Sequence, residues 1–279
     1  MKAVFTMWRN TRMIILTAVC AAIYSAALLA FKTAIPLIPG ITEVRVGNIF
    51  PMPFGLMFGP AGAWGSAIGN LIGDIFGGTI GPSSLAGFVG NFLLGYLPYT
   101  LWTTLVPFHQ KSLDWDPRSW SNWLTYILIA FISAAACAVV ISVFVDFLGI
   151  VPFRFLVKII FINNSLGRLI GAILLSSVFI LVKDHLHLFW GDVMDEADQG
   201  KPLFGTLGAW IVSLSTLFGF SGGLGTHLIL NTDIFIIDIH TINTAININF
   251  SMGNSVFLAT QLPIGWITTL AILLGCVLL

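Results

Sequence analysis

Apolar residues form seven long runs along the chain, separated by short polar segments or by segments rich in glycine and proline. A bilayer core of about 30 Å needs about 20 helical residues to span it, so these runs predict transmembrane helices. A shorter apolar run, 46–58, contains Pro51 and Pro53 and is interpreted as either a kinked short helix or a re-entrant segment. Gly59-Pro60 then predicts a tight turn, with proline at the first position of the next helix. The seven predicted helices cover residues 13–31, 61–79, 83–106, 122–147, 155–182, 203–220 and 255–279.

The helix that follows this turn carries two stripes of non-bulky residues. Glycines recur every four residues along one stripe, and a polar stripe lies beside it, about 100° around the helix. Glycine lets a neighbouring helix approach closely in lipid. An amide and a carboxylate at membrane depth are costly unless they face protein, water or a ligand. We therefore expect a packing face formed by Gly65, Gly69, Gly73 and Gly77, and a polar face formed by Ser66, Asn70 and Asp74.

Composition places the chain among integral membrane proteins. Of its 279 residues, 57% are hydrophobic and 9% are charged, and the mean hydropathy is +0.96. Soluble domains carry about 25% charged residues. The net charge is zero and no long basic run is present, which argues against a nucleic-acid partner. The three cysteines, Cys20, Cys137 and Cys276, lie far apart in apolar segments, so neither a disulfide framework nor a metal site is expected.

Lysine and arginine favour a cytoplasmic N-terminus for this all-α polytopic protein. We expect residues 1–182 to form a six-helix membrane unit, followed by an acidic, solvated cytoplasmic linker at 183–202. Residues 203–279 are predicted to form a two-helix extension with an outer polar segment, 221–253, whose isoleucine, threonine and asparagine content favours extended structure. With this orientation the cytoplasmic cations are Lys2, Arg9, Arg12, Lys111, Arg118, Lys183 and Lys201, and the outer ones are Lys32, Arg45, Arg154 and Lys158.

Several polar residues at membrane depth are candidates for a binding site. Asp74 and Arg168 are predicted at similar depth in the outer half of the membrane, where they either pair with each other or frame a polar ligand. In the outer loop, Glu43 and Arg45 either pair locally or contact a ligand. The full set of candidate binding residues is Asn48, Asn70, Asp74, Asn91 and Arg168.

The first helix carries a further stripe of small residues, Ala18, Ala22 and Ala26, at spacing four. Such a stripe is a docking surface, for another helix of this chain or for a partner subunit. No catalytic motif is expected. Gly219-Phe-Ser-Gly222 resembles an intramembrane serine protease motif, but the last helix has no histidine to act as the base. No phosphate-binding glycine-lysine loop is present, so the chain is not expected to hydrolyse ATP. No cofactor or metal is expected.

The segment Arg45-Val-Gly-Asn-Ile-Phe-Pro51, the glycine-rich stretch 58–74 and the alanine-striped first helix together resemble the substrate-binding (S) components of energy-coupling factor (ECF) vitamin transporters. The resemblance covers about 11–182 and is specific over 43–80. It implies a six-helix bundle with an outward-opening pocket for a vitamin-like nutrient, gated by the loop at about 33–45. It also implies a membrane coupling subunit, docked on the first helix, and cytoplasmic ATPases. Residues 183–279 have no counterpart in this resemblance.

The sequence therefore predicts a substrate-capture subunit in the cell membrane that binds a small organic micronutrient. Trp64, near the cytoplasmic start of its helix, is not expected in the pocket. Two other functions stay open: a stand-alone secondary transporter that uses Asp74 as its proton or cation site, and a membrane scaffold or enzyme. The substrate itself is left open among thiamine-like, flavin, corrinoid, deazapurine and amino-acid-like molecules.

Overall fold

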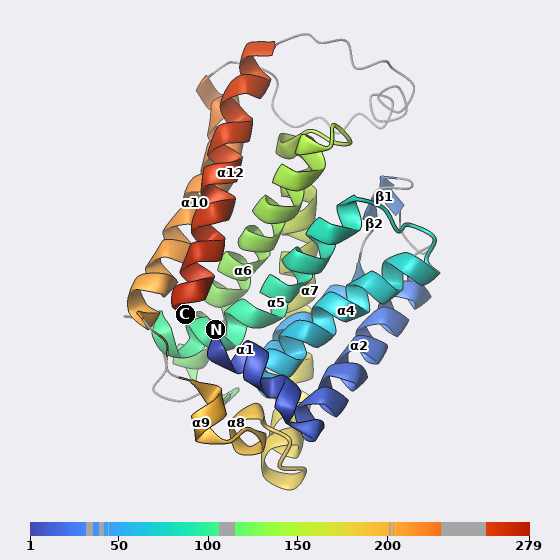
Figure 1. The fold of residues 1–279 in the computed structure, drawn as a ribbon, viewed down its shortest axis with the longest axis vertical. Helices are drawn as coiled ribbons and strands as arrows, with labels where there is room; N and C mark the ends of the chain where they lie inside the picture. The colour runs from blue at the N-terminus through green and yellow to red at the C-terminus, as the bar shows by residue number, and fades with distance from the viewer. Residues whose placement is uncertain are drawn as a thin grey trace.

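The protein is an all-α membrane protein built from tilted, closely packed helices (Figure 1). The structure, a computed structural model, describes residues 1–31, 36–38, 42–43, 45–105, 115–200, 202, 204–229 and 255–279. The side chains of 36–38, 42–43, 223–229 and 255–263 are not among those described. The longer helices are α2 (Thr11–Phe31), α4 (Pro60–Phe76), α5 (Ser83–Thr104), α6 (Trp120–Phe147), α7 (Phe153–Ile180), α10 (Gly205–Ile229) and α12 (Ser255–Leu278).

Each of the seven predicted membrane helices corresponds to one of these long helices. Local chemistry fixes several of their ends. Asn10 precedes α2, and its side-chain oxygen accepts hydrogen bonds from the backbone N–H groups of Arg12 at 2.9 Å and Met13 at 3.3 Å. Such a cap satisfies donors that the first turn of a helix leaves free. Among the described residues, the helices long and apolar enough to cross a membrane are Thr11–Phe31, Trp120–Phe147 and Phe153–Val193.

The apolar run 46–58 forms a short helix, preceded by a 3-10 turn. The turn, η2, covers Val46–Ile49, and the helix, α3, covers Pro51–Phe58. Every residue from Pro51 to Met57 is buried, and α3 is covered by α4, α5 and α7. Gly59 follows with a φ of +53°, a conformation that favours glycine, and Pro60 opens α4. A helix too short to span a membrane is tolerated here because protein surrounds its ends.

The α2 and α4 helices lie side by side, and the glycine stripe of α4 faces α2 (Figure 1). A Cβ atom at Gly69 would lie 2.9 Å from the carbonyl oxygen of Ala21, closer than side-chain carbons approach. At Gly73 it would meet Leu28 at 3.1 Å. The backbones therefore pack directly on each other, as small residues permit in lipid. Between α2 and η2 the chain forms an antiparallel two-stranded hairpin of β1 (Pro36–Ile38) and β2 (Thr42–Glu43), in which Pro36 is paired with Glu43 and Ile38 with Thr42.

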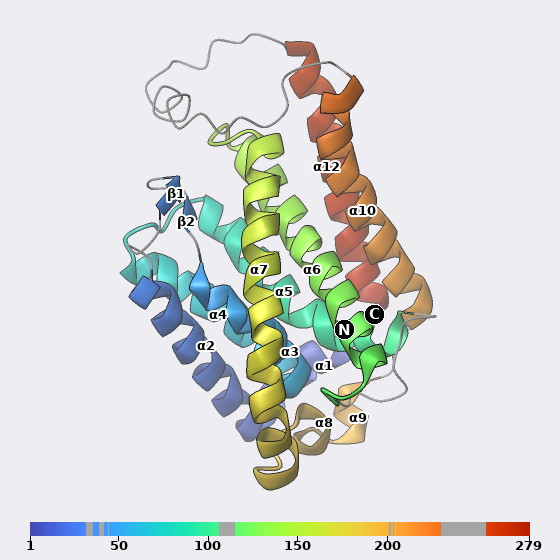
Figure 2. The same cartoon turned by 180° about the vertical axis from the view of Figure 1, so that it is seen from behind.

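The C-terminal extension is a helical hairpin. Its helices, α10 and α12, pack on each other and against α6 (Figure 2). Tyr96 of α5 donates a hydrogen bond of 2.8 Å to the carbonyl of Cys276, which ties the hairpin to the rest of the bundle. The helix α10 continues to Ile229, so the extended structure predicted from residue 221 does not begin there. Packing explains the difference, because Gly219 lets α10 lie close to α12, where an added Cβ atom would meet the Thr268 hydroxyl oxygen at 2.9 Å. The remainder of that prediction, 230–254, lies outside the described residues.

The segment predicted as a solvated linker is packed beneath the N-terminus. It holds a π-helical turn, η3 (Leu181–His185), and two short helices, α8 (Trp190–Val193) and α9 (Glu196–Gln199). Of these, α9 lies against α1 (Lys2–Thr6) and α8 lies beside the start of α2 (Figure 1). A 3-10 turn, η1 (Met7–Arg9), connects α1 to the residue before α2. The acidic side chains Asp184, Asp192, Asp195 and Glu196 are exposed as expected. Among the apolar ones, Val193 and Met194 are buried with Met7 and Met13, whereas Leu186 is exposed. Hydrogen bonds across this contact run from Lys2 to the Ala197 carbonyl, from Thr6 to that of Asp198 and from Asn10 to that of Val193.

Candidate substrate-binding site

Tyr24 lies at the centre of a buried group of amide side chains, which we call the amide cluster: Tyr24, Asn48, Asn91 and Asn164. The Tyr24 hydroxyl lies 2.9 Å from the Asn48 side-chain oxygen and 2.7 Å from that of Asn91. The Asn48 amino group donates to the Asn164 oxygen at 2.6 Å. Each residue comes from a different element (α2, η2, α5 and α7), and none is more than 3% exposed. Four elements thus converge on one polar point inside an apolar bundle.

A second group of polar side chains, which we call the polar arm, adjoins the amide cluster: Arg45, Asn70 and Asp74. The Arg45 guanidinium donates to the Asn70 oxygen at 2.9 Å, and the Asn70 amino group donates to the Asp74 carboxylate at 3.3 Å. The backbone N–H of Arg45 donates to the Asn163 side chain at 3.0 Å. Asn70 is buried, whereas Arg45 and Asp74 are partly exposed. The two groups together form a polar region that is buried at one side and reaches the surface at the other.

The hydrogen bonds of the amide cluster can be drawn in two ways, because the oxygen and nitrogen of an asparagine side chain can be exchanged by turning over the amide group. Tyr24 has one O–H but two amide oxygens within reach, and the buried amino nitrogen of Asn164 has no hydrogen-bond partner. Turning over the amides of Asn48 and Asn164 exchanges their oxygen and nitrogen positions. Asn164 then donates to Asn48, Asn48 donates to Tyr24, and Tyr24 donates to Asn91 alone.

Glycines make room for this polar region at two points. A Cβ atom at Gly167 of α7 would lie 2.8 Å from the backbone carbonyl carbon of Asn48, so only glycine lets η2 approach α7 at the cluster. A Cβ atom at Gly87 of α5 would lie 2.9 Å from the amino nitrogen of Asn70. Both close contacts involve an amide that the sequence predicts in the site. The positions of Asn48 and Asn70 therefore depend on helix packing as well as on their own hydrogen bonds.

Arg168 has a different place from the other predicted site residues. Its side chain is wholly buried, with 0% exposure. The guanidinium donates to Ser133, to the carbonyls of Ala130 and Leu94, each at 3.2 Å, and lies 4.0 Å from the Met52 sulfur. These contacts are with α3, α5 and α6, and Asp74 is not among them. The ion pair considered between Asp74 and Arg168 is thus replaced by contacts with neutral groups.

The structure places the other predicted residues as follows. Asn48 and Asn91 meet at Tyr24, and Asn70 and Asp74 lie in the polar arm with Arg45. Glu43 belongs to β2, and its side chain lies outside those described. The sequence prediction did not include Tyr24, Asn163 and Asn164 among the site residues. Two adjacent asparagines within an apolar helix are a signal that could have found Asn163 and Asn164, because amides are costly at membrane depth. Tyr24 gives no such signal.

The two small-residue stripes face different surroundings. Ala18, Ala22 and Ala26 are exposed on the side of α2 that points away from the bundle. The α4 stripe packs against the opposite side of α2 at Gly65, Gly69 and Gly73, and Gly77 is the C-cap residue of α4. Trp64, excluded from the predicted pocket, donates from its indole N–H to the Val4 carbonyl at 2.9 Å, next to α1.

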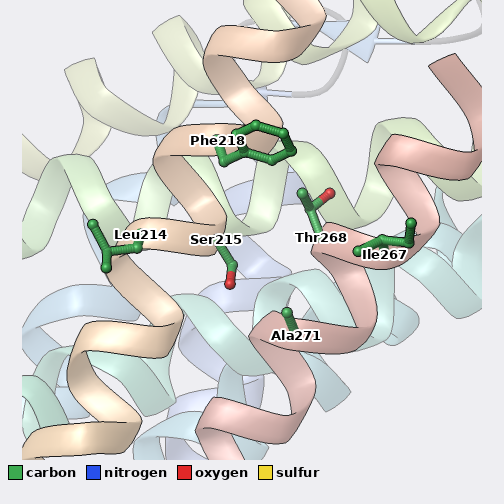
Figure 3. A pocket seen from close by; sticks show the side chains of 6 residues that line it. All are labelled: Leu214, Ser215, Phe218, Ile267, Thr268 and Ala271. Carbon is green, nitrogen blue, oxygen red and sulfur yellow. The ribbon is translucent and has the colours of Figure 1, made fainter. Parts of the chain in front are cut away.

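A shallow groove of about 260 Å³ lies elsewhere, between α10 and α12 (Figure 3). Leu214, Phe218 and Ile267 at its rim are 57–65% exposed. The Thr268 hydroxyl donates to carbonyls of its own helix, at 2.8 and 2.9 Å. The groove carries no charged group and does not resemble the polar region. Its lining consists of Leu214, Ser215, Phe218, Ile267, Thr268 and Ala271.

Polar side chains that converge inside a bundle of membrane helices are typical of membrane transport proteins, in which they mark the solute pathway. Comparison with protein families agrees. The family described as QueT transporter matches residues 14–180, which hold the whole polar region. The chain belongs to this family, whose members are S components of ECF-type transporters. Searches of curated proteins and of solved structures gave no significant match.

Proposed function

We propose that this chain is the S component that captures a deazapurine base, the queuosine precursor of its family, outside the cell and delivers it across the membrane. The observation that carries the proposal is the convergence of five asparagine side chains and one carboxylate from four elements (η2, α4, α5 and α7) at one place. Neutral amides supply both donors and acceptors, which suits the edges of a heterocyclic base better than it suits an ion. The family membership supports the transport role.

Within this site Asp74 is suited to read one edge of the base. A base of the 2-amino-4-oxo type presents two neighbouring N–H donors, which a carboxylate accepts as a pair of charge-assisted hydrogen bonds. Asp74 is partly exposed, and among the described residues its side chain accepts a hydrogen bond from Asn70 on one of its two oxygens. The other oxygen is thus available to a ligand. Asn70, held by Arg45, fixes the carboxylate from behind.

The remaining predicted residues have supporting roles in this proposal. Asn48 and Asn91 form the floor of the site through Tyr24, and the hairpin segment with Glu43 and Arg45 closes over it. Arg45 bridges the two, since its backbone bonds to Asn163 of α7 and its side chain to Asn70 of α4. Arg168 supports the site from within the bundle, because its guanidinium is occupied by protein groups.

A coupling subunit and cytoplasmic ATPases supply the energy in this proposal, since the chain has no phosphate-binding loop. The exposed alanine side of α2 is the proposed docking face for the coupling subunit. It is flanked by the exposed side chains of Val19 and Ile23, so an apolar membrane helix fits it. The proposed orientation places the N-terminus and α8–α9 in the cytoplasm and the β1–β2 hairpin outside.

The direct test is ligand identification followed by a specificity series. The protein is purified in detergent from its own host, and native mass spectrometry identifies any retained small molecule and any copurifying polypeptide. Titration calorimetry then compares a 7-deazaguanine base with the matching 7-deazaadenine, which lacks the 2-amino-4-oxo edge. We expect the first to bind at least about 100-fold more tightly, because a site that pairs with N–H groups rejects a ligand lacking them. If neither base binds, the result contradicts the proposed function.

A further inference from the structure

The buried guanidinium of Arg168 lies beside a proline in the neighbouring helix. Pro98 stands inside α5, and proline has no backbone N–H. The carbonyl four residues earlier, that of Leu94, therefore lacks the partner it would have in an uninterrupted helix. The Arg168 guanidinium donates to this Leu94 carbonyl at 3.2 Å. A group on α7 thus supplies the donor that Pro98 removes from α5.

Arg168 and its contacts Leu94 and Met52 each lie about one helical turn along the chain from a member of the amide cluster. Leu94 follows Asn91 by three residues on α5, and Arg168 follows Asn164 by four on α7. On the chain entering α3, Met52 follows Asn48 by four. On α6, Ser133 precedes Cys137, the neighbour of Asn164, by four. Three or four residues correspond to about one turn, or roughly 5 Å of rise. One layer of contacts around Arg168 thus lies directly against the layer that holds the amides.

We infer that Arg168 is a positioning residue: by replacing the N–H that Pro98 removes, it fixes α5, α6 and α7 against each other and thereby sets the spacing of the amide cluster. The energetic reason is that a carbonyl without a donor is costly inside a membrane protein, and so is a buried cation without acceptors. The Arg168 guanidinium supplies the donor that the Leu94 carbonyl lacks, and this carbonyl is one of the acceptors of the buried cation. Removing Arg168 alone therefore leaves the Leu94 carbonyl without a hydrogen bond inside the bundle.

The inference is tested by a double-mutant cycle on the full chain, with R168M, P98A and the combination R168M/P98A. R168M removes all donors but keeps an apolar side chain, and P98A gives the Leu94 carbonyl a helical N–H. We expect R168M to lower the melting temperature markedly in the wild-type background and to lower it much less in the P98A background. Equal shifts in the two backgrounds overturn the inference, because the two sites would then be independent. The inference is also overturned if both R168M and R168M/P98A fail to fold, because P98A then does not compensate for the loss of Arg168.

The positioning role needs a second readout, ligand affinity below the melting temperature of every variant. This readout alone rests on the proposed function; the melting-temperature cycle needs no ligand. With a 7-deazaguanine base as the probe, we expect R168M to weaken binding about tenfold or more and R168M/P98A to recover most of that loss. If Arg168 contacted the base directly, P98A would restore stability but not affinity, and that result would overturn the positioning role. Wild-type affinity in folded R168M would overturn it as well. If the wild-type protein bound no base while the stability cycle showed coupling, the proposed function would fail and the Arg168–Pro98 link would stand.

Discussion

At the scale of single residues, the protein places amide side chains at membrane depth and gives them hydrogen bonds to other side chains and to backbone carbonyls. Asn70, Asn91 and Asn48 are at most 3% exposed, and each has a hydrogen bond to another side chain or to a carbonyl. Asp74 differs from these three residues, since it is partly exposed and its side-chain hydrogen bond to Asn70 uses only one oxygen. Because Asp74 is a partly exposed carboxylate with an oxygen still available, we expect it to be the residue most sensitive to a bound ligand.

The substitution Asp74→Asn tests this difference. It keeps the size of the side chain but removes the charge and one acceptor. We expect the affinity for a 7-deazaguanine base to fall about 10- to 100-fold, because hydrogen bonds to a charged group contribute about 1.5–3 kcal/mol. Calorimetric titration measures the change, and the melting temperature of the ligand-free protein serves as the folding control. Unchanged binding combined with loss of transport would instead favour a proton or cation site at Asp74, as in a secondary transporter.

At the scale of elements, α2 has two different sides: one faces the polar region and the other is exposed. One side of the helix carries Tyr24, which reaches the amide cluster, and packs on the glycine stripe of α4. The other side carries Ala18, Ala22 and Ala26 and is exposed. A single rigid element therefore connects the proposed ligand site with the proposed docking face. Changes on its two sides should have different consequences.

The packing side is tested by Gly69→Ala, with Gly81→Ala as the matched control. A methyl group at Gly69 would lie 2.9 Å from the Ala21 carbonyl, whereas at Gly81 nothing lies within 4 Å. Overpacking of this kind costs about 1–3 kcal/mol. We expect a clearly lower melting temperature for the Gly69 variant and almost no change for the control. Equal melting temperatures would show that α2 and α4 separate easily, against the packing described above.

The exposed side is tested by Ala22→Ile, which adds bulk where a partner helix would approach. We expect the variant to fold and to bind the base normally, because Ala22 has no role inside the bundle. Copurification of the coupling subunit and uptake of the base should both fall strongly. Ser177→Ile, at an exposed position of α7, is the control for added bulk on a lipid-facing surface. Full uptake by the Ala22 variant would place the partner elsewhere.

At the scale of the whole molecule, the bundle consists of two parts of the chain: the region that matches the family and the C-terminal helical hairpin. Residues 14–180 match the family and contain the polar region, whereas α10 and α12 follow that match and cover α6. The chain termini lie near each other at one side of the bundle, and the β1–β2 hairpin lies towards the opposite end (Figure 1). The proposed topology therefore has both termini and α8–α9 in the cytoplasm.

This topology is checked by labelling single introduced cysteines with a membrane-impermeant thiol reagent in intact cells. Ile80→Cys and Ile150→Cys, both at exposed positions in outer turns, should react without permeabilisation. Ala197→Cys in α9 should react only after permeabilisation. The three native cysteines are buried and provide a low background. The reverse labelling pattern would invert the orientation and would remove the outward-facing site from the proposal.

The sequence by itself determined the helices and the candidate polar residues, because both depend on local properties. Apolar runs of membrane length, the Gly59-Pro60 turn and the glycine stripe of α4 each act through neighbours a few residues away. The bounds of α6 differ from the predicted ones by two residues at the start and agree at the end, and those of α7 differ by two residues at each end. Asn48, Asn70 and Asn91 stood out because amides are rare at membrane depth.

Only the tertiary structure decided how those residues combine. The proximity of Tyr24 to two amides, the placement of Asn164 and the packing of 183–200 under α1 depend on contacts between segments far apart in the chain. Arg168 shows the reason most clearly. Its charge suggested a partner of opposite charge, but its acceptors are backbone carbonyls and a hydroxyl on other helices, one of them left free by Pro98. Every residue of a chain carries a carbonyl, so sequence cannot indicate which one a distant side chain will reach; helix packing decides that.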